Sequence, residues 1–173
     1  MMAARAEVWL DWPKKVELAW LIREGVPGLA LARPTPIMVA TGSKTHDGIF
    51  EHAEHGERWI AFEQEDDFVF WHARRNAFAT YSNRAFALGE EAIDNPGTYA
   101  FEGALNIFAS PLDWLRAGRD GIVVVDWSRA FERLRDAPRI TIVEGLLPLY
   151  KRHMRPPRMP EIFVMRSSWR AAA

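Results

Sequence analysis

The chain has 173 residues, of which 49% are hydrophobic and 26% charged, and its formal net charge is −1. A chain of this length and composition buries a core of its own, and its near-zero charge argues against a polyanion binder driven by bulk charge. It contains no cysteine, which excludes disulfides, thiolate metal sites and a cysteine nucleophile.

The first expected element is a helix that opens at Trp12-Pro13, with Asp11 as a candidate N-cap. Apolar residues recur at helical spacing until Gly25, which ends the helix. An irregular segment rich in proline and glycine follows. The run 37–40 then predicts a short buried strand.

Residues 48–82 are typical of an antiparallel meander. Short β-prone runs occupy Gly48–His52, Arg58–Phe62, Phe68–Trp71 and Ala77–Tyr81, with turn residues between them. Strands this close in sequence need only tight turns, which favours antiparallel pairing. We expect the first two runs to form a hairpin.

The pattern changes near Pro96-Gly97, where strand-like runs begin to alternate with helical ones. The runs are Ala104–Ala109, Ile122–Val125, Ile140–Val143 and Ile162–Met165. Crossovers of this kind join parallel strands through right-handed connections.

The chain is therefore predicted to have an α+β fold in a single domain, residues 1–173. One lobe, residues 1–95, contains the N-terminal helix and the antiparallel β-meander. The other, residues 96–173, contains a compact β-α-β-α-β-α-β unit with mainly parallel strands.

The sequence also carries an expectation about location. The first residues lack the apolar run of a signal peptide, and no stretch reaches the roughly 18 apolar residues that a membrane helix needs. We expect a soluble, cytoplasmic protein without a membrane partner.

Acidic residues follow the predicted strands of the second lobe. Asp126 and Glu144 come directly after two strands, and Asp113 lies at the helix start after another. Ligands of open α/β sheets bind at the carboxyl ends of strands, and three carboxylates could hold Mg²⁺ there. Acids at helix N-termini also serve as caps, with Ser110 and Pro111 completing such a start. Both interpretations stay open.

These motifs resemble the toprim domain of primases and topoisomerases. Phe101-Glu102-Gly103 or Val143-Glu144-Gly145 could supply its glutamate motif, and Val125-Asp126-Trp127-Ser128 stands where its Asp-x-Asp pair would be. The resemblance implies magnesium-dependent chemistry on nucleic acids. Ser128 stands at the place of the second aspartate, and Glu144 follows Asp126 instead of preceding it, so the resemblance implies a degenerate, inactive relative.

A second resemblance covers more of the chain. The segments RAFALGEE (84–91), SPLDWLRAG (110–118), GIVVVDW (121–127) and RPPRMPEIFV (155–164) resemble uncharacterised bacterial proteins that are carried with plasmid or phage replication genes. This resemblance implies a protein of a mobile genetic element that acts in a nucleic-acid setting. It implies no particular activity.

Histidines and acids crowd the segment around the first meander strand. His46, His52 and His55 are weak candidates for a metal site, because imidazole and carboxylate are zinc ligands. Alternation along a strand places Glu51 and His52 on opposite faces, which favours an exposed polar hairpin instead.

The C-terminal segment is basic, and five of its side chains are candidates for phosphate contacts. They are Lys151, Arg152, Arg155, Arg158 and Arg166. A solvated helix face followed by a proline-rich loop explains them equally well. The segment 47–67 is acidic, so the two segments could also attract each other, within one chain or between two copies.

Three functions remain open. The first, which we favour, is a non-catalytic accessory or interaction protein, with a protein partner, self-association or weak nucleic-acid binding. The second is a magnesium-dependent enzyme that uses Asp113, Asp126 and Glu144. The third is a homo-oligomeric scaffold. No cofactor is expected outside the enzyme hypothesis.

Overall fold

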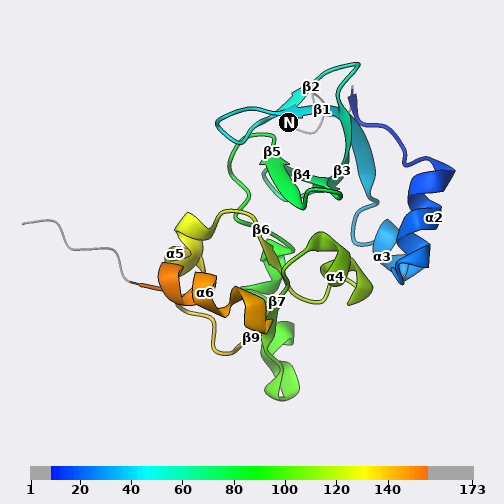
Figure 1. The fold of residues 1–173 in the computed structure, drawn as a ribbon. Helices are drawn as coiled ribbons and strands as arrows, with labels where there is room; N and C mark the ends of the chain where they lie inside the picture. The colour runs from blue at the N-terminus through cyan, green and yellow to red at the C-terminus, as the bar shows by residue number, and fades with distance from the viewer. Residues whose placement is uncertain (1–8, 156–173) are drawn as a thin grey trace, which may run out of the picture.

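The computed structural model describes residues 9–155. Their main element is a strongly curved five-stranded antiparallel sheet, with two helices on one side and a smaller unit of short strands and helices beneath it (Figure 1). The α+β fold class is therefore confirmed.

The sheet has the strand order β2-β1-β3-β4-β5, with every pair antiparallel. Its strands are β1 (Met38–Lys44), β2 (Phe50–His52), β3 (Glu57–Glu63), β4 (Phe68–His72) and β5 (Ala77–Thr80). The expected hairpin between the first two meander runs is wrong, because β1 lies between β2 and β3. Gly42 permits this arrangement, since a Cβ atom there would stand 2.1 Å from the carbonyl oxygen of Glu51.

One face of the sheet carries an aromatic cluster. Phe50 and Phe70 stack with ring centroids 4.0 Å apart, and Trp9 lies 5.8 and 5.7 Å from them. Tyr81 and His52 flank the Trp9 ring at 5.8 and 6.1 Å. The segment before the first helix therefore covers this face with its own indole ring.

Two helices, α2 (Lys15–Arg23) and α3 (Gly28–Ala32), pack against the other face. The helix was expected to begin after Asp11, but Asp11 pairs with Val39 as an extended bridge, with its amide 2.8 Å from the Val39 oxygen. The helix begins only at Lys15, so Lys14 and not Asp11 takes the N-cap position. The amide of Lys14 donates to the carboxylate of Glu17 at 2.7 Å.

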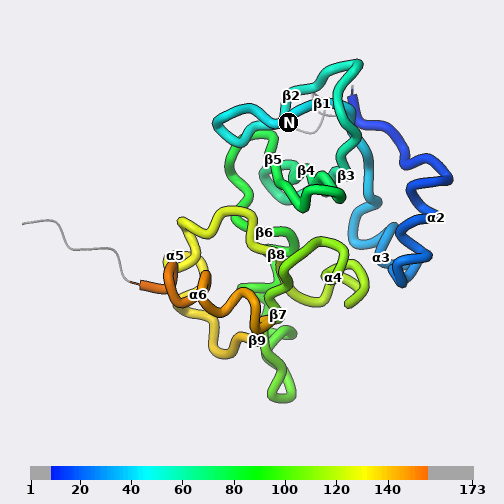
Figure 2. The backbone as a smooth tube through the Cα atoms, in the orientation of Figure 1, coloured from blue at the N-terminus to red at the C-terminus, as the bar shows by residue number. Residues whose placement is uncertain are grey.

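The smaller unit contains four short strands, and Figure 2 shows the path of the chain between them. They are β6 (Ala87–Leu88), β7 (Leu105–Ile107), β8 (Val123–Val124) and β9 (Ile140–Ile142). Its α-helices are α4 (Pro111–Arg116), α5 (Ala130–Leu134) and α6 (Leu147–His153). Its 3₁₀ helices are η2 (Glu90–Ala92), η3 (Pro96–Glu102), η4 (Trp127–Arg129) and η5 (Glu144–Leu146).

The predicted unit of parallel strands is not confirmed as a whole. β7 and β9 pair in parallel, but β8 joins β7 only through the single parallel bridge Ile107–Ile122 and pairs antiparallel with β6. The amide of Val125 already donates to the Phe86 oxygen at 2.8 Å, which ties the end of β8 to the β6 side. The strand expected at Ile162–Met165 lies outside the described residues.

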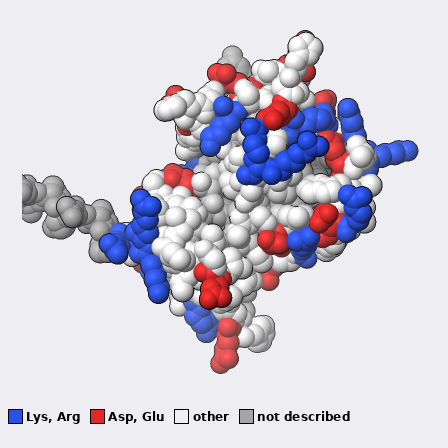
Figure 3. Space-filling view, viewed as in Figure 1, with Lys and Arg blue, Asp and Glu red and all other residues white. Residues whose placement is uncertain are grey.

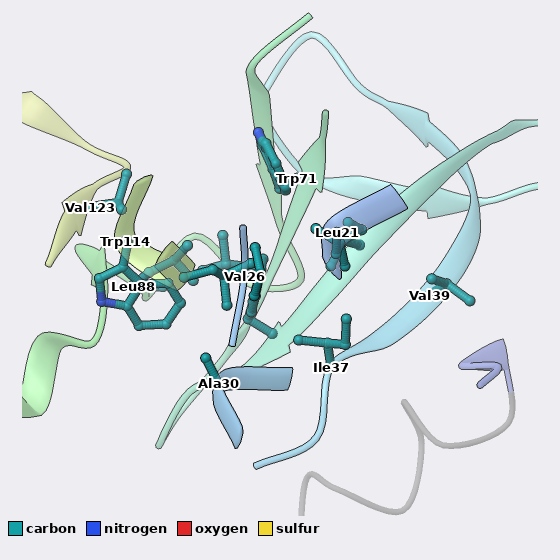
Figure 4. Packing of buried hydrophobic residues seen from close by; sticks show 14 residues of the cluster. Leu21, Val26, Ala30, Ile37, Val39, Trp71, Leu88, Trp114 and Val123 are labelled. Carbon is teal, nitrogen blue, oxygen red and sulfur yellow. The ribbon is translucent and has the colours of Figure 1, made fainter. Parts of the chain in front are cut away.

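The core is continuous between the sheet and the smaller unit. Leu21 of α2 and Trp71 of β4 belong to the same buried cluster as Leu88, Trp114 and Val123 (Figure 4). The helices, the sheet and the smaller unit therefore share one packed interior.

A single carboxylate organises the loops at this junction. Asp67 is only 5% exposed. Its Oδ1 accepts the amides of Phe68 and Ser82, both at 2.8 Å, and its Oδ2 accepts those of Arg84 and Ala85 at 2.7 and 3.0 Å. The carboxylate thus fixes the chain where it passes from β5 toward β6.

Within residues 9–155, no helix has the length and apolar character that crossing a membrane requires.

Candidate interaction surface

The capping interpretation expects Asp126 and Glu144 to cap helices and Asp113 to complete a capping box, and all three acids lie at helix starts. Ser110 caps α4 by accepting the Asp113 amide at 3.2 Å, and the Asp113 carboxylate contacts Ser110 Oγ at 2.8 Å and Arg116 at 3.0 Å. Asp126 caps η4, accepting from the amide and hydroxyl of Ser128 at 3.0 and 2.6 Å. The N-cap predicted at Ser110 is confirmed.

Glu144 is exposed at the first position of η5, where Val143 is the N-cap residue and no side chain caps the helix, so the cap expected at Glu144 is wrong. Asp126 lines an open cleft of about 670 Å³ together with Lys44 and Asp47, whereas Asp113 and Glu144 are not among the residues that line it. Across residues 9–155, no three His, Asp or Glu side chains are grouped so that they could hold a metal ion. The magnesium-enzyme hypothesis therefore stays a prediction without a grouped ligand set in the described chain.

The histidine candidates are separated. His46 contacts the neighbouring carboxylate of Asp47 at 3.4 Å on the surface. His52 stacks on Trp9, and His55 is exposed in the turn between β2 and β3.

The basic candidates are described only in part. Lys151 and Arg152 are exposed on α6, and Arg155 is exposed just beyond it. Figure 3 shows Lys and Arg atoms projecting at the left side of the molecule, where Figure 1 places α5 and α6. Arg158 and Arg166 lie outside the described residues.

A different surface carries the largest group of exposed apolar side chains in the described chain. Trp12, Val16, Ile22 and Leu29 are 69%, 71%, 58% and 66% exposed. They lie just before α2, on α2 and on α3, which follow each other along one side of the molecule (Figure 1). We call these four residues, with the exposed Ala19, the α2–α3 surface.

Helix geometry explains why these side chains are exposed. Leu21 is 0% exposed and, with Leu18, faces the core. Val16, Ala19 and Ile22 recur every three residues and therefore form a continuous row on another side of the helix. The apolar arc of α2 is wider than the face that packs on the sheet, so part of the arc remains exposed to solvent.

The sequence contained a signal for this surface that the sequence analysis missed. Apolar residues run almost without interruption from Val16 to Ile22, broken only by Glu17. A helix that packs only one face needs a narrower stripe. The additional apolar residues predict either that the helix is buried on all sides or that its second apolar face binds another molecule. The structure excludes burial on all sides.

Two ion pairs hold α2 at its two ends. The Glu17 carboxylate accepts from Arg58 Nε and Nη2 of β3 at 2.6 and 3.0 Å. At the other end, Arg116 Nη2 of α4 lies 3.1 Å from the Glu24 carboxylate, and its Nε donates to the Glu24 carbonyl oxygen at 2.6 Å. The α2–α3 surface is therefore presented on a helix that is fixed before any partner arrives.

The same ion pairs set the charge around the surface. Lys14, Lys15, Arg23 and Arg33 are exposed at its borders. The acids Glu17 and Glu24 are engaged by arginines from elsewhere in the fold, which leaves Asp11 as the remaining acid of this stretch. Figure 3 shows Lys and Arg atoms along the right edge, where Figure 1 places α2. The surface is apolar with a basic border.

Acid is expected to weaken the attachment of α2. Burial acts to raise the pKa of Glu17, but the hydrogen bonds from Arg58 and the Lys14 amide outweigh it, so that the pKa is lowered. A carboxyl group whose pKa is lower in the folded state than in the unfolded state stabilises the fold at pH values above its unfolded-state pKa. This stabilisation is lost as the pH falls through the pKa of the folded state. We therefore expect the free energy of unfolding to fall more steeply below about pH 4 in the wild type than in Glu17→Gln.

Urea denaturation at a series of pH values measures this difference. The exposed Glu51→Gln variant is the matched control and should keep the wild-type dependence. An acid slope that is unchanged in Glu17→Gln would refute the assignment.

Comparisons of the chain with protein-family models, with curated proteins and with solved structures found no match. The case for a function therefore rests on the chain's own geometry.

Proposed function

We propose that this protein is a non-catalytic interaction protein that binds a partner protein through the α2–α3 surface. The observation that carries the proposal is the group of exposed apolar side chains on a helix fixed at both ends. Contiguous exposed apolar surface with a polar border is typical of protein-binding sites. The mobile-element and nucleic-acid setting that the sequence resemblance implies stays part of the proposal.

The energetics of burial favour this function. Covering one large apolar side chain contributes about 1.5–3 kcal/mol, and Trp12 adds the kind of aromatic anchor that is enriched among interface hot spots. Because α2 is already held by Arg58 and Arg116, binding does not have to order it, which lowers the entropic cost of association.

Site-specific photo-crosslinking tests the proposal. A photo-reactive phenylalanine analogue at Val16 of the full chain, in the cells that naturally make the protein, should give discrete protein adducts. The same analogue at the exposed Glu132 of α5 should not. Adding Ile22→Glu should reduce the adducts from position 16, because it places a charge within the apolar row.

The folding control is simple for these positions. Substitutions at exposed sites change the free energy of unfolding by about 0.5 kcal/mol or less, so loss of adducts would not reflect unfolding. No adducts from position 16, or equal adducts from position 132, would contradict the proposal.

A second candidate, contact with nucleic acid, is favoured by the exposure of Lys151, Arg152 and Arg155 at the end of α6. It would act through phosphate neutralisation and would depend strongly on salt.

A further inference from the structure

We infer that the partner of the α2–α3 surface is an acidic amphipathic helix whose apolar side packs on Val16, Ala19 and Ile22. This inference rests on the proposed function and adds the chemistry of the partner. It follows from the charge around the surface and from the spacing of its apolar row.

The charges select an acidic partner. Lys14, Lys15 and Arg23 flank the apolar row along α2, Arg33 follows α3, and all four are exposed. Glu17 and Glu24 offset them less, because Arg58 and Arg116 from β3 and α4 already engage these carboxylates, and Asp11 is the one further acid of the stretch. Complementary charge steers association and rejects partners of like sign.

The shape favours a helix. Val16, Ala19 and Ile22 form a ridge of the i, i+3 type, and the methyl group of Ala19 makes a shallow dip between two larger side chains. Helices pack by placing the ridge of one between the ridges of the other. A larger apolar side chain of a partner helix would lie over Ala19, between Val16 and Ile22.

A second copy of this chain fits less well. A symmetric dimer through this surface would place Lys15 and Arg23 of one copy near the same residues of the other. Nucleic acid also fits less well, since Trp12 is the one ring of the surface that can stack on a base, and the aliphatic Val16, Ile22 and Leu29 offer neither hydrogen bonds nor stacking.

Two synthetic peptides test the inference on the full chain. Both are about 20 residues long with the same leucines on one helical face; one carries glutamate on the other face and the second carries lysine. Anisotropy of labelled peptide should show that the acidic peptide binds at least tenfold more tightly at about 50 mM salt, with the preference reduced at about 500 mM.

Variants locate the effect. Lys15→Glu with Arg23→Glu should abolish or reverse the preference, whereas Lys151→Glu with Arg152→Glu, an equal charge change on α6, should leave it intact. Val16→Glu with Ile22→Glu should remove binding of both peptides.

The outcomes separate this inference from the function on which it rests. Equal affinity for both peptides, together with adducts from position 16, would overturn the acidic partner and leave the interaction function standing. Absence of those adducts would overturn the function itself. Two other results would overturn the inference in favour of another occupant. One is dimerisation in light scattering, and the other is binding of a single-stranded oligonucleotide more tightly than the acidic peptide. In either case the Lys15→Glu, Arg23→Glu variant should lose the effect.

Discussion

Replacing Asp67 with alanine is expected to lower the free energy of unfolding by about 3–5 kcal/mol. The carboxylate is nearly inaccessible to solvent and accepts the amides of Phe68, Ser82, Arg84 and Ala85. Alanine would leave these donors without their acceptor at a crowded junction, and an unsatisfied buried donor costs more than an ordinary hydrogen bond contributes.

Two further variants at this junction sharpen the test. Asp67→Asn keeps the shape of the side chain and one acceptor oxygen, but its NH₂ group faces one pair of backbone donors. We therefore expect this variant to lose part of the free energy of unfolding that Asp67→Ala loses. Asp66→Ala changes the exposed neighbouring acid and should alter stability by about 0.5 kcal/mol or less. Urea denaturation with unchanged m-values measures all three. Equal stability of Asp67→Ala and Asp66→Ala would refute the role of Asp67.

Replacing Phe70 with alanine is expected to cost a similar amount, about 3–5 kcal/mol. Its ring is 0% exposed and stacks 4.0 Å from Phe50, with Trp9 across the same face. Alanine would remove the ring that both neighbours pack against and leave a cavity beneath Trp9, which the strands on either side cannot close.

Thermal and urea unfolding measure the Phe70 effect, and Trp9 should become more accessible to a fluorescence quencher. Phe70→Leu should cost less, because it refills part of the volume. Phe101→Ala makes the same chemical change at a side chain that is 104% exposed, and its effect should be about 0.5 kcal/mol or less. Matching losses at the two positions would contradict the packing argument.

Local patterns predicted the elements better than their arrangement. The antiparallel strands and the capped start of α4 at Ser110 follow from alternation and from the preference of serine for N-caps, both of which act within a few residues. The insertion of β1 between β2 and β3 also needs the pairing of Met38 with Ala61, which are far apart in the sequence but adjacent in space. Strand order is decided by such non-local packing.

The contacts of individual side chains were also difficult to predict from the sequence, as the α2–α3 surface and Asp67 show. Val16 and Ile22 are residue types that are typical of a core. Only the packing of Leu21 decides which side of the helix lies against the rest of the fold. Asp67 has the pattern of a turn residue, and three of its four donors, the amides of Ser82, Arg84 and Ala85, reach it only after folding. The width of the apolar arc on α2 was nevertheless visible in the sequence.

The pairing of β7 with β9 also affects how the chain folds as it is synthesised. β3, β4 and β5 pair with their immediate sequence neighbours, so this part of the sheet can form soon after it leaves the ribosome. Leu105 and Ile107 of β7 must wait for β9, which is made only after α4, β8 and α5. During this interval one edge of β7 and its apolar side chains are exposed to non-native contacts, so we expect the smaller unit to be completed last.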